Sequence, residues 1–308
     1  MKLLIELPTW LGDCVMATPA IENIIFEYPD SEVIFIGSKV SVDLMKNHPR
    51  CLEGIYLKKS IFNLIFLTNK IGPVDIFFSF RGSLRVKLFS IFLAAKKKFQ
   101  YKKNKFKSGH QVEKYNEFIN KSLCVTRPPN RLKIYKKNLK QKPNKLILGI
   151  NPGASYGSAK CWPYENFIKV AISLSDRFDI LIFGGKDEVI LSKKIEKGLI
   201  KFGCKNFVNL AGKTSIDDLV DKISTLSLFI TGDSGPMHIA SAFQIPTIAI
   251  FGPTKIFETS PWQNPRSVIL KKDLACQPCM KRVCPLGHHN CMKAINSKDV
   301  IDSALRLI

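Results

Sequence analysis

Short apolar runs alternate with amphipathic segments along the chain. A short apolar run at 2–7 is ended by Pro8, and runs rich in β-branched and aromatic residues at 32–36 and 74–78 are bounded by turn residues. These patterns are typical of buried strands. Between the first two runs, apolar residues recur at helical spacing and predict a helix over residues 15–28. The first half of the chain therefore starts as a strand–helix–strand series.

The second half repeats this alternation more clearly. Strands are predicted at 146–150, 178–183, 207–210, 228–231 and 247–251. Helices are predicted at 162–177, 187–200, 216–225 and 237–243. A series of this kind favours parallel sheets with helices on both faces, that is, an α/β doubly wound fold.

The length of 308 residues fits two such domains. Pro128, Pro129 and the polar, Lys-rich stretch 136–145 mark the boundary. We therefore predict an N-terminal domain over residues 1–140 and a C-terminal domain over residues 141–308, and leave open that the last helix packs back on the first domain. A ligand would bind in the cleft between them, beyond the carboxyl ends of the strands.

Positive charge is concentrated in one part of the chain. The sequence has 47 Lys and Arg against 25 Asp and Glu, a net charge of +22. Residues 96–145 alone hold 17 basic and two acidic side chains, hence 15 of the net charges. Such an excess indicates a polyanionic partner: nucleic acid, an anionic membrane surface or a phosphorylated small molecule. A general lysine bias explains part of the excess but not its asymmetry.

No segment reaches the roughly 18 apolar residues of a spanning helix, and the N-terminus lacks the apolar region of a signal peptide. We therefore expect a cytoplasmic protein with reduced cysteines or cysteines that bind metal. The apolar run 88–93 lies between Arg85 and Lys87 on one side and three lysines at 96–98 on the other. A core helix with basic ends is favoured here over a peripheral contact with anionic lipid.

The first loop with candidate chemistry is Leu7-Pro-Thr-Trp-Leu-Gly-Asp13, directly after the first predicted strand. Its position places Asp13 at the carboxyl end of that strand. An Asp at a helix start is usually a cap. Apolar neighbours such as Trp10 and Val15 could also raise the pKa of the Asp13 carboxyl and make it a usable general base. The local pattern alone favours the cap.

Two loops of the second half suit an anion. Residues 151–160 are small and end in Lys160, so backbone N–H groups could approach an anion beside a positive charge. In residues 231–238 the N–H groups of Ser234 and Gly235 would face a phosphate, and Asp233 could accept hydrogen bonds from sugar hydroxyls. Neither loop is a Walker A or dinucleotide fingerprint. Together they predict a diphosphate ligand.

Each loop also has a simpler interpretation. Residues 151–160 could be a turn of small residues with an exposed Lys. Residues 231–238 could be a capped helix start, with His238 on the helix surface.

Four cysteines lie close together near the C-terminus, with His288 and His289 among them: Cys276, Cys279, Cys284 and Cys291. Such a cluster in a cytosolic chain could bind Zn²⁺. Its spacing lacks the long gap between two cysteine pairs that zinc ribbons and fingers have. Thiols that pack a long loop are therefore favoured over a structural metal site.

Four motifs, in order along the chain, resemble the signatures of one family. They are Leu7-Pro-Thr-Trp-Leu-Gly-Asp-Cys-Val-Met-Ala-Thr-Pro-Ala-Ile21, Pro152-Gly-Ala-Ser-Tyr-Gly-Ser-Ala-Lys-Cys-Trp-Pro163, Gly232-Asp-Ser-Gly-Pro-Met-His238 with Phe251-Gly-Pro-Thr254, and the tail at 276–292. Phe183-Gly-Gly-Lys-Asp-Glu188 and Ser108-Gly-His110 are weaker matches. The chain thus resembles the ADP-heptose:lipopolysaccharide heptosyltransferases of glycosyltransferase family 9, and its tail is most similar to the heptosyltransferase II branch. Residues 96–145 match no motif, and Pro236 stands where relatives often carry Leu.

The resemblance implies a GT-B fold of two Rossmann-like domains with an interdomain cleft. It implies inverting, metal-independent heptose transfer from ADP-heptose to the inner core of lipopolysaccharide or lipooligosaccharide, with Hep-Kdo-lipid A as the acceptor and no cofactor. The first domain would bind the acceptor and the second the donor. The alternatives are another GT-B sugar-nucleotide transferase, or a heptosyltransferase I or III acting at a different core position.

Carried over onto this sequence, the family pattern makes Asp13 the general base, which overturns the cap interpretation, and lets Lys160 neutralise the departing diphosphate. The donor-binding residues would be Ser155, Tyr156, Lys160, Asp233, Ser234, Gly235 and His238. The acceptor-binding residues would be Arg81, Arg85 and His110.

The resemblance also narrows the meaning of the charge. An anionic lipid acceptor implies that residues 96–145, with Arg81 and Arg85, dock the enzyme on the inner face of the cytoplasmic membrane. The rival hypothesis is a basic nucleic-acid-binding protein, because aromatic residues are interleaved in this segment. No nucleic-acid motif occurs, and that hypothesis leaves the two anion loops unexplained. We therefore expect no nucleic-acid partner.

Overall fold

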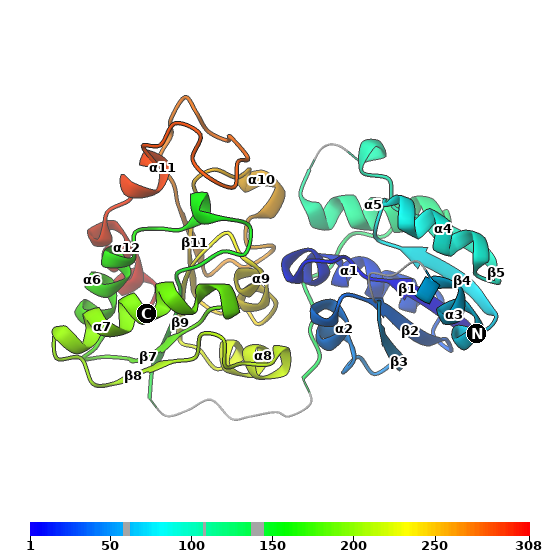
Figure 1. The fold of residues 1–308 in the computed structure, drawn as a ribbon, viewed down its shortest axis with the longest axis horizontal. Helices are drawn as coiled ribbons and strands as arrows, with labels where there is room; N and C mark the ends of the chain where they lie inside the picture. Colours follow the sequence, from blue (N-terminus) through cyan, green and yellow to red (C-terminus); the bar gives the residue numbers. More distant parts are fainter. Residues whose placement is uncertain (58–61, 107–108, 137–144) are drawn as a thin grey trace. The chain divides into compact units, whose positions relative to one another are not determined.

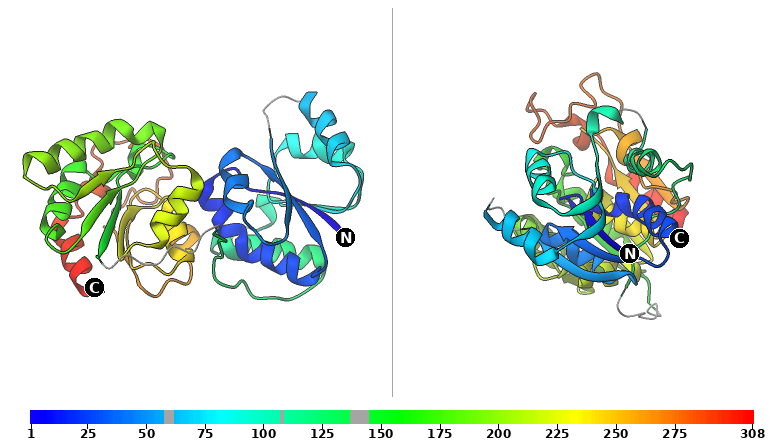
Figure 2. Two further views of the ribbon diagram at one scale, coloured as in Figure 1. Left: turned by 90° about the horizontal axis from the view of Figure 1, so that it is seen from below. Right: turned by 90° about the vertical axis from the view of Figure 1, so that its right-hand side faces the viewer.

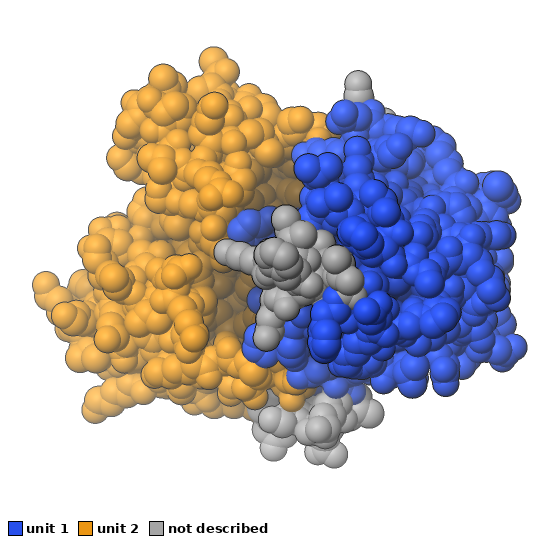
Figure 3. Space-filling model, turned by 45° about the vertical axis from the view of Figure 1, so that its right-hand side comes forward, with its two compact units in different colours: residues 1–137 blue, residues 138–308 orange. Residues whose placement is uncertain are grey.

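The chain folds into two compact units, Met1–Lys137 and Asn138–Ile308 (Figure 3). The computed structural model describes residues 1–57, 62–106, 109–136 and 145–308, and for residues 62–65 it describes the backbone only. The expected boundary after residue 140 lies outside these residues, as does most of the Lys-rich stretch 136–145. None of the described helices is both long and apolar enough to cross a bilayer.

Unit 1 is built on a five-stranded parallel sheet in the order β3-β2-β1-β4-β5 (Figure 1). Its strands are β1 (Lys2–Glu6), β2 (Glu32–Gly37), β3 (Cys51–Tyr56), β4 (Val74–Ser79) and β5 (Ala95–Gln100). Its helices are α1 (Leu11–Glu27), α2 (Lys39–Met45), α3 (Phe62–Ile71), α4 (Leu84–Phe92), the 3-10 turn η1 (Lys103–Lys105) and α5 (Gln111–Leu123).

Unit 2 is built on a six-stranded parallel sheet in the order β11-β10-β9-β6-β7-β8. Its strands are β6 (Ile147–Asn151), β7 (Asp179–Ile182), β8 (Phe207–Asn209), β9 (Leu228–Gly232), β10 (Thr247–Ile250) and β11 (Ser267–Leu270). Its helical elements are η2 (Ser158–Lys160), α6 (Tyr164–Leu174), η3 (Lys186–Glu188), α7 (Val189–Lys201), α8 (Ile216–Ser224), α9 (Gly235–Ala242), α10 (Ile256–Thr259), α11 (Asn290–Lys293) and α12 (Ser297–Leu307). The last helix, α12, lies against α6 and β10 of this unit.

Helices cover both faces of each sheet (Figures 1 and 2), which explains the continuous apolar runs of the central strands. In unit 1, Phe77 of β4 faces α4 and contacts Phe89 edge to face, with ring centroids 5.6 Å apart. The next residue, Phe78, points to the other face and stacks on Phe99 of β5. The α/β doubly wound prediction is confirmed for both halves of the chain.

Part of the basic segment 96–145 is built into unit 1. Residues 96–98 lie on β5, the edge strand of the sheet, where Lys side chains discourage pairing with another chain. The Lys96 ammonium contacts the Asp75 carboxylate at 2.6 Å, and the Lys98 ammonium donates to the Ser90 carbonyl at 2.5 Å, in the last turn of α4. Lys114 is buried in α5. Several of these charges thus have structural roles.

Candidate active site

The strand order of each sheet reverses between two central strands, β1 and β4 in unit 1 and β6 and β9 in unit 2. Ligands of open α/β sheets bind at the carboxyl ends of such strands, because the loops that follow them turn to opposite faces. The register pairs Glu6 with Ser79 and Asn151 with Thr231, so the loops after these strands start side by side. Most of the predicted site residues follow these four strands.

Asp13 follows β1 and lies in the first turn of α1, where the helix dipole stabilises a carboxylate. The N-cap position is taken by Trp10, whose side chain makes no capping hydrogen bond, so the interpretation of Asp13 as the cap is wrong. The Asp13 side chain is half-buried. Burial raises the pKa of Tyr115 on α5 well above its usual range, and the nearby Asp13 charge adds to that shift.

Arg81 lies just beyond β4, beside a buried acid that the sequence analysis did not single out. Glu6, at the end of β1, accepts hydrogen bonds from Ser79 Oγ at 2.7 Å and from Arg81 Nη1 at 3.3 Å. Burial raises the pKa of Glu6, and these two residues and the charge of Arg85 partly offset the shift. Glu6 thereby holds Arg81 at the switch point of unit 1.

His110 has a structural partner on its own helix. It is buried and sits at the N-cap of α5, where its Nδ1 accepts the Val112 N–H at 3.2 Å. The Glu113 carboxylate accepts the His110 backbone N–H at 2.7 Å and completes a capping arrangement. This capping role explains the buried position of His110 without any contact to an acceptor substrate.

In unit 2, the two loops proposed to hold a diphosphate meet through an ion pair. The Lys160 ammonium donates to Asp233 Oδ2 at 2.6 Å and to the Asp233 carbonyl at 3.1 Å. The two side chains are only 12% and 6% exposed. Thr254 Oγ1 donates to the same carboxylate oxygen at 2.7 Å. Lys160 is therefore not the exposed lysine of the simpler interpretation.

Asn151 and Ser234 join the ends of β6 and β9 in a polar network. The Asn151 amide donates to Thr231 Oγ1 at 3.3 Å and to Ser234 Oγ at 3.4 Å. Ser234 is the N-cap of α9. Pro236 has no N–H and the Met237 N–H donates to the Ser234 carbonyl, so the helix offers an anion the N–H of Gly235 and its dipole. His238, on the same helix, is 2% exposed, so its placement on the helix surface is wrong.

The tail supports the loop that carries Lys160. Tyr156 Oη donates to the Met280 carbonyl at 2.6 Å, and the Lys160 ammonium lies 4.8 Å from the centroid of the Tyr156 ring. Ala159 donates its N–H to the Arg282 carbonyl at 3.0 Å, and its own carbonyl lies 2.9 Å from His289 Nε2. Ser155 is exposed in this loop. The loop is thus fixed by contacts from more than 120 residues away.

Gly157 lies against the tail at a position with no room for a side chain. A Cβ at position 157 would lie 2.3 Å from the Arg282 carbonyl oxygen, and the backbone has a φ of +150°. We therefore expect Gly157→Ala to lower stability by about 1–3 kcal/mol, the usual cost of forced overpacking, and to weaken ADP binding. Thermal unfolding and ADP titration would measure both effects. Gly203→Ala is the matched control, since that glycine also has positive φ but no atom within 4 Å of its added Cβ. Equal losses in the two variants would contradict the role of the contact.

The four tail cysteines surround one small apolar cavity of about 20 Å³, which His288 and His289 also line. All four are free thiols. Burial raises the pKa of Cys291, and the charges of the other three cysteines raise it further. The pKa of Cys284 is lowered instead, mainly by a hydrogen bond from the His289 backbone N–H. Within the described ranges, no three or more metal-binding side chains are placed to hold an ion. The metal site stays a prediction without support from this geometry.

Comparison with known proteins adds to this geometry. The sequence model of one protein family, glycosyltransferase family 9 (heptosyltransferase), matches residues 73–290 of this chain. The chain belongs to this family. It is 44% identical to lipooligosaccharide heptosyltransferase 2 of Campylobacter jejuni serotype O:2, over 100% of this chain and 98% of that protein. It is 26% identical to the enzyme of the same name from Haemophilus ducreyi, over 100% and 99% of the two chains.

Solved structures of family 9 proteins share the fold. The ADP-heptose lipopolysaccharide heptosyltransferase II of Escherichia coli matches with a TM-score of 0.82 at 20% identity, over 100% of this chain and 98% of that one. A glycosyltransferase family 9 protein of Veillonella parvula matches equally well, at 21% identity over 99% and 96% of the chains. The GT-B fold and the glycosyltransferase assignment predicted from the motifs are confirmed, as is the similarity to heptosyltransferase II.

Proposed function

We propose that this family 9 glycosyltransferase transfers L-glycero-D-manno-heptose from ADP-heptose to Hep-Kdo-lipid A, in the inner core of lipopolysaccharide or lipooligosaccharide. The observation that carries the proposal is the 44% identity, over the whole chain, to a lipooligosaccharide heptosyltransferase 2. The geometry supports it, because Asp13 and Arg81 follow the switch-point strands of unit 1 and the Lys160–Asp233 pair follows those of unit 2. Unit 1 would bind the acceptor and unit 2 the donor.

In the proposed reaction, the Asp13 carboxylate takes the proton of an acceptor hydroxyl as that oxygen attacks the anomeric carbon of the heptose. The attack comes from the face opposite ADP, so the configuration inverts while the bonding pair leaves with the diphosphate. Lys160 has three N–H donors, of which two are directed to Asp233, so one remains for a phosphate oxygen. The backbone N–H groups of Ser234 and Gly235, at the start of α9, would further stabilise the negative charge of the departing diphosphate.

Asp233, Ser155 and Tyr156 complete the proposed donor site. Asp233 is held by Lys160 and Thr254, and its carboxylate would accept hydrogen bonds from heptose hydroxyls. Arg81 and Arg85 would attract the carboxylates and phosphates of the acceptor. The enzyme would work at the inner face of the cytoplasmic membrane, where this acceptor is anchored.

Purified protein should release ADP from ADP-heptose only when a Hep-Kdo-lipid A acceptor is present, and the product should gain one heptose by mass spectrometry. Excess EDTA should leave the rate unchanged, because the proposed charge stabilisation comes from Lys160 and backbone N–H groups rather than from a metal. Transfer only to an acceptor without the first heptose would instead favour a heptosyltransferase I activity. Inactivity with ADP-heptose but turnover of another sugar nucleotide would overturn the donor assignment.

A further inference from the structure

Helix α4 has an apolar face that no other part of the described structure covers. On one side of the helix, Val86 and Phe89 are buried against the sheet. On the other side, Leu84 is 71% and Ile91 70% exposed, and their spacing of seven residues puts them on the same helix face. Phe92, at the end of the helix, is 51% exposed. We call Leu84, Ile91 and Phe92, with Lys87, the outer face of α4.

The apolar surface extends beyond this helix. Helix α3 packs beside α4 and exposes Phe66, which is 73% accessible to solvent. Single exposed apolar residues are normal on soluble proteins, but neighbouring ones on two adjacent helices indicate a binding surface. The core-helix interpretation of residues 88–93 therefore explains only one side of α4.

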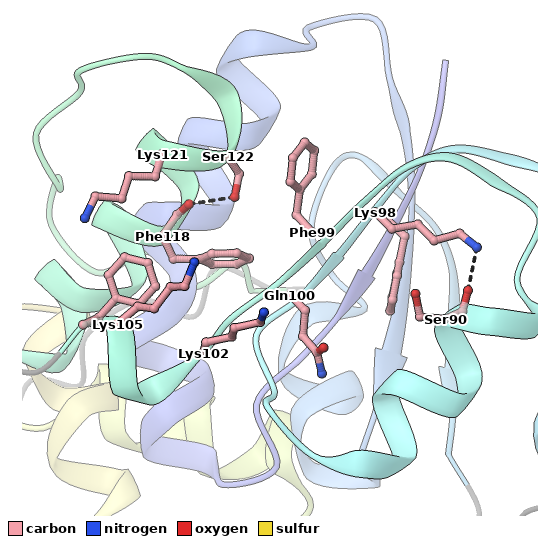
Figure 4. A pocket seen from close by; sticks show the side chains of 11 residues that line it. Ser90, Lys98, Phe99, Gln100, Lys102, Lys105, Phe118, Lys121 and Ser122 are labelled. Carbon is pink, nitrogen blue, oxygen red and sulfur yellow. Dashed lines mark hydrogen bonds between the residues drawn. The ribbon is translucent and has the colours of Figure 1, made fainter.

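Cationic side chains adjoin this apolar surface. Lys87 lies within the outer face, three residues after Leu84 and four before Ile91, and is exposed. Beyond the edge strand β5 lies a hollow of about 440 Å³, flanked by α4 and α5. Four lysines from β5, the following turn and α5 line this hollow (Figure 4): Lys98, Lys102, Lys105 and Lys121.

The lysines of the hollow differ in how they are held. Lys98 is bound to the Ser90 carbonyl, and Lys121 pairs with Glu117 at 2.5 Å and lies 5.1 Å from the centroid of the Phe106 ring. Lys102 and Lys105 are exposed, and neither side chain makes a hydrogen bond or an ion pair with any residue that the structure describes. Their positive charges are thus available to an external anion.

We propose that the outer face of α4 and the lysines of the β5 hollow together form a docking site for an anionic phospholipid bilayer. The apolar side chains would enter the acyl region while Lys87, Lys102 and Lys105 meet phosphate groups, which is how amphipathic interfacial helices bind. A soluble polyanion would match the lysines but leave Leu84, Ile91 and Phe66 in water. This inference rests on the proposed function, for which it names the membrane-binding surface.

Vesicle sedimentation tests the docking site with the full chain. The protein should sediment with phosphatidylcholine vesicles that contain phosphatidylglycerol, less so as NaCl rises, and not with phosphatidylcholine alone. Lys102→Gln with Lys105→Gln should weaken binding about 30-fold, and Leu84→Ser with Ile91→Ser at least about tenfold. The matched controls are Lys197→Gln with Lys201→Gln and the single change Ile190→Ser, which alter exposed residues of α7 and should bind like the parent.

Each contrary result has a definite meaning. Equal binding by the α4 variant and the parent would overturn the apolar contact, and equal binding by the lysine variant would overturn the hollow. Release by inorganic phosphate beyond the effect of chloride at equal ionic strength would identify a free-phosphate site instead. A parent dimer that the α4 variant disrupts, without loss of vesicle binding, would make the face a contact between copies.

A transfer assay with a de-acylated, water-soluble core acceptor separates this inference from the proposed function. All four variants should keep the parent rate, since their residues lie outside the proposed catalytic and donor machinery. If the parent fails to transfer heptose but sediments as expected, the proposed function falls and the docking site stands. If the variants transfer normally and sediment like the parent, the docking site falls alone.

Discussion

Replacing Asp13 with asparagine should lower kcat at least about 100-fold, and up to about 10,000-fold, because positioned general bases typically contribute that much. The amide keeps the shape of the side chain in the first turn of α1 but cannot accept the acceptor proton. ADP affinity should stay close to that of the parent, since the proposed donor residues are all on unit 2. Steady-state kinetics and ADP calorimetry would measure the two quantities.

Asp30→Asn is the control for that variant. It makes the same chemical change at an exposed position beyond the end of α1 and should leave the rate unaltered. Normal turnover by the Asp13 variant would remove Asp13 from the mechanism. A loss of ADP affinity as large as the loss of rate would show that the residue acts through folding or donor binding rather than as a base.

Replacing Lys160 with methionine should damage both stability and donor binding. Removal of one partner from a buried ion pair leaves a charge without compensation, at a cost of about 3–5 kcal/mol. The Lys160–Asp233 pair is buried enough for this cost to apply. We expect a large drop in the melting temperature, a weaker affinity for ADP and a lower kcat, measured by calorimetry and by the transfer assay.

A second substitution separates the two effects. Adding Asp233→Asn to Lys160→Met removes the stranded charge and should restore most of the stability, but not donor binding or transfer. Lys186→Met changes an exposed lysine of the same unit and should be nearly neutral. Recovery of transfer in the double variant would show that the pair supports the fold only. An unchanged donor KM and kcat in the single variant would refute the catalytic role of Lys160.

The central strands and the site loops could be predicted from sequence, because both leave local signals. Buried strands of a parallel sheet are continuous apolar runs, as in β1 and β9, and loops that approach an anion need small residues. Strand β5 could not be found in this way. Its three lysines are typical of an edge strand, and by composition alone they resemble a solvated basic patch.

The contacts between distant segments also escaped sequence reasoning. In the sequence, Glu6 is only the polar end of an apolar run, and its role depends on hydrogen bonds from Ser79 and Arg81, more than 70 residues away. Helix α5 could have been predicted, since Val112, Tyr115 and Ile119 recur at helical spacing. It was missed because the lysines around it favoured the interpretation of this segment as a basic surface. Thr254 ends the third family motif, but its hydrogen bond to Asp233 depends on how the two loops fold together.

The contacts between the tail and the Lys160 loop provide a criterion for deciding which related sequences encode an active enzyme. A chain that ends before residue 276 would retain Asp13, Lys160 and Asp233 and would score well on the first three signatures. It would lack the Met280 and Arg282 carbonyls that hold Tyr156 and Ala159. We expect natural or engineered truncations of this kind to be inactive, so the tail is a better marker of a competent enzyme than the number of matched motifs.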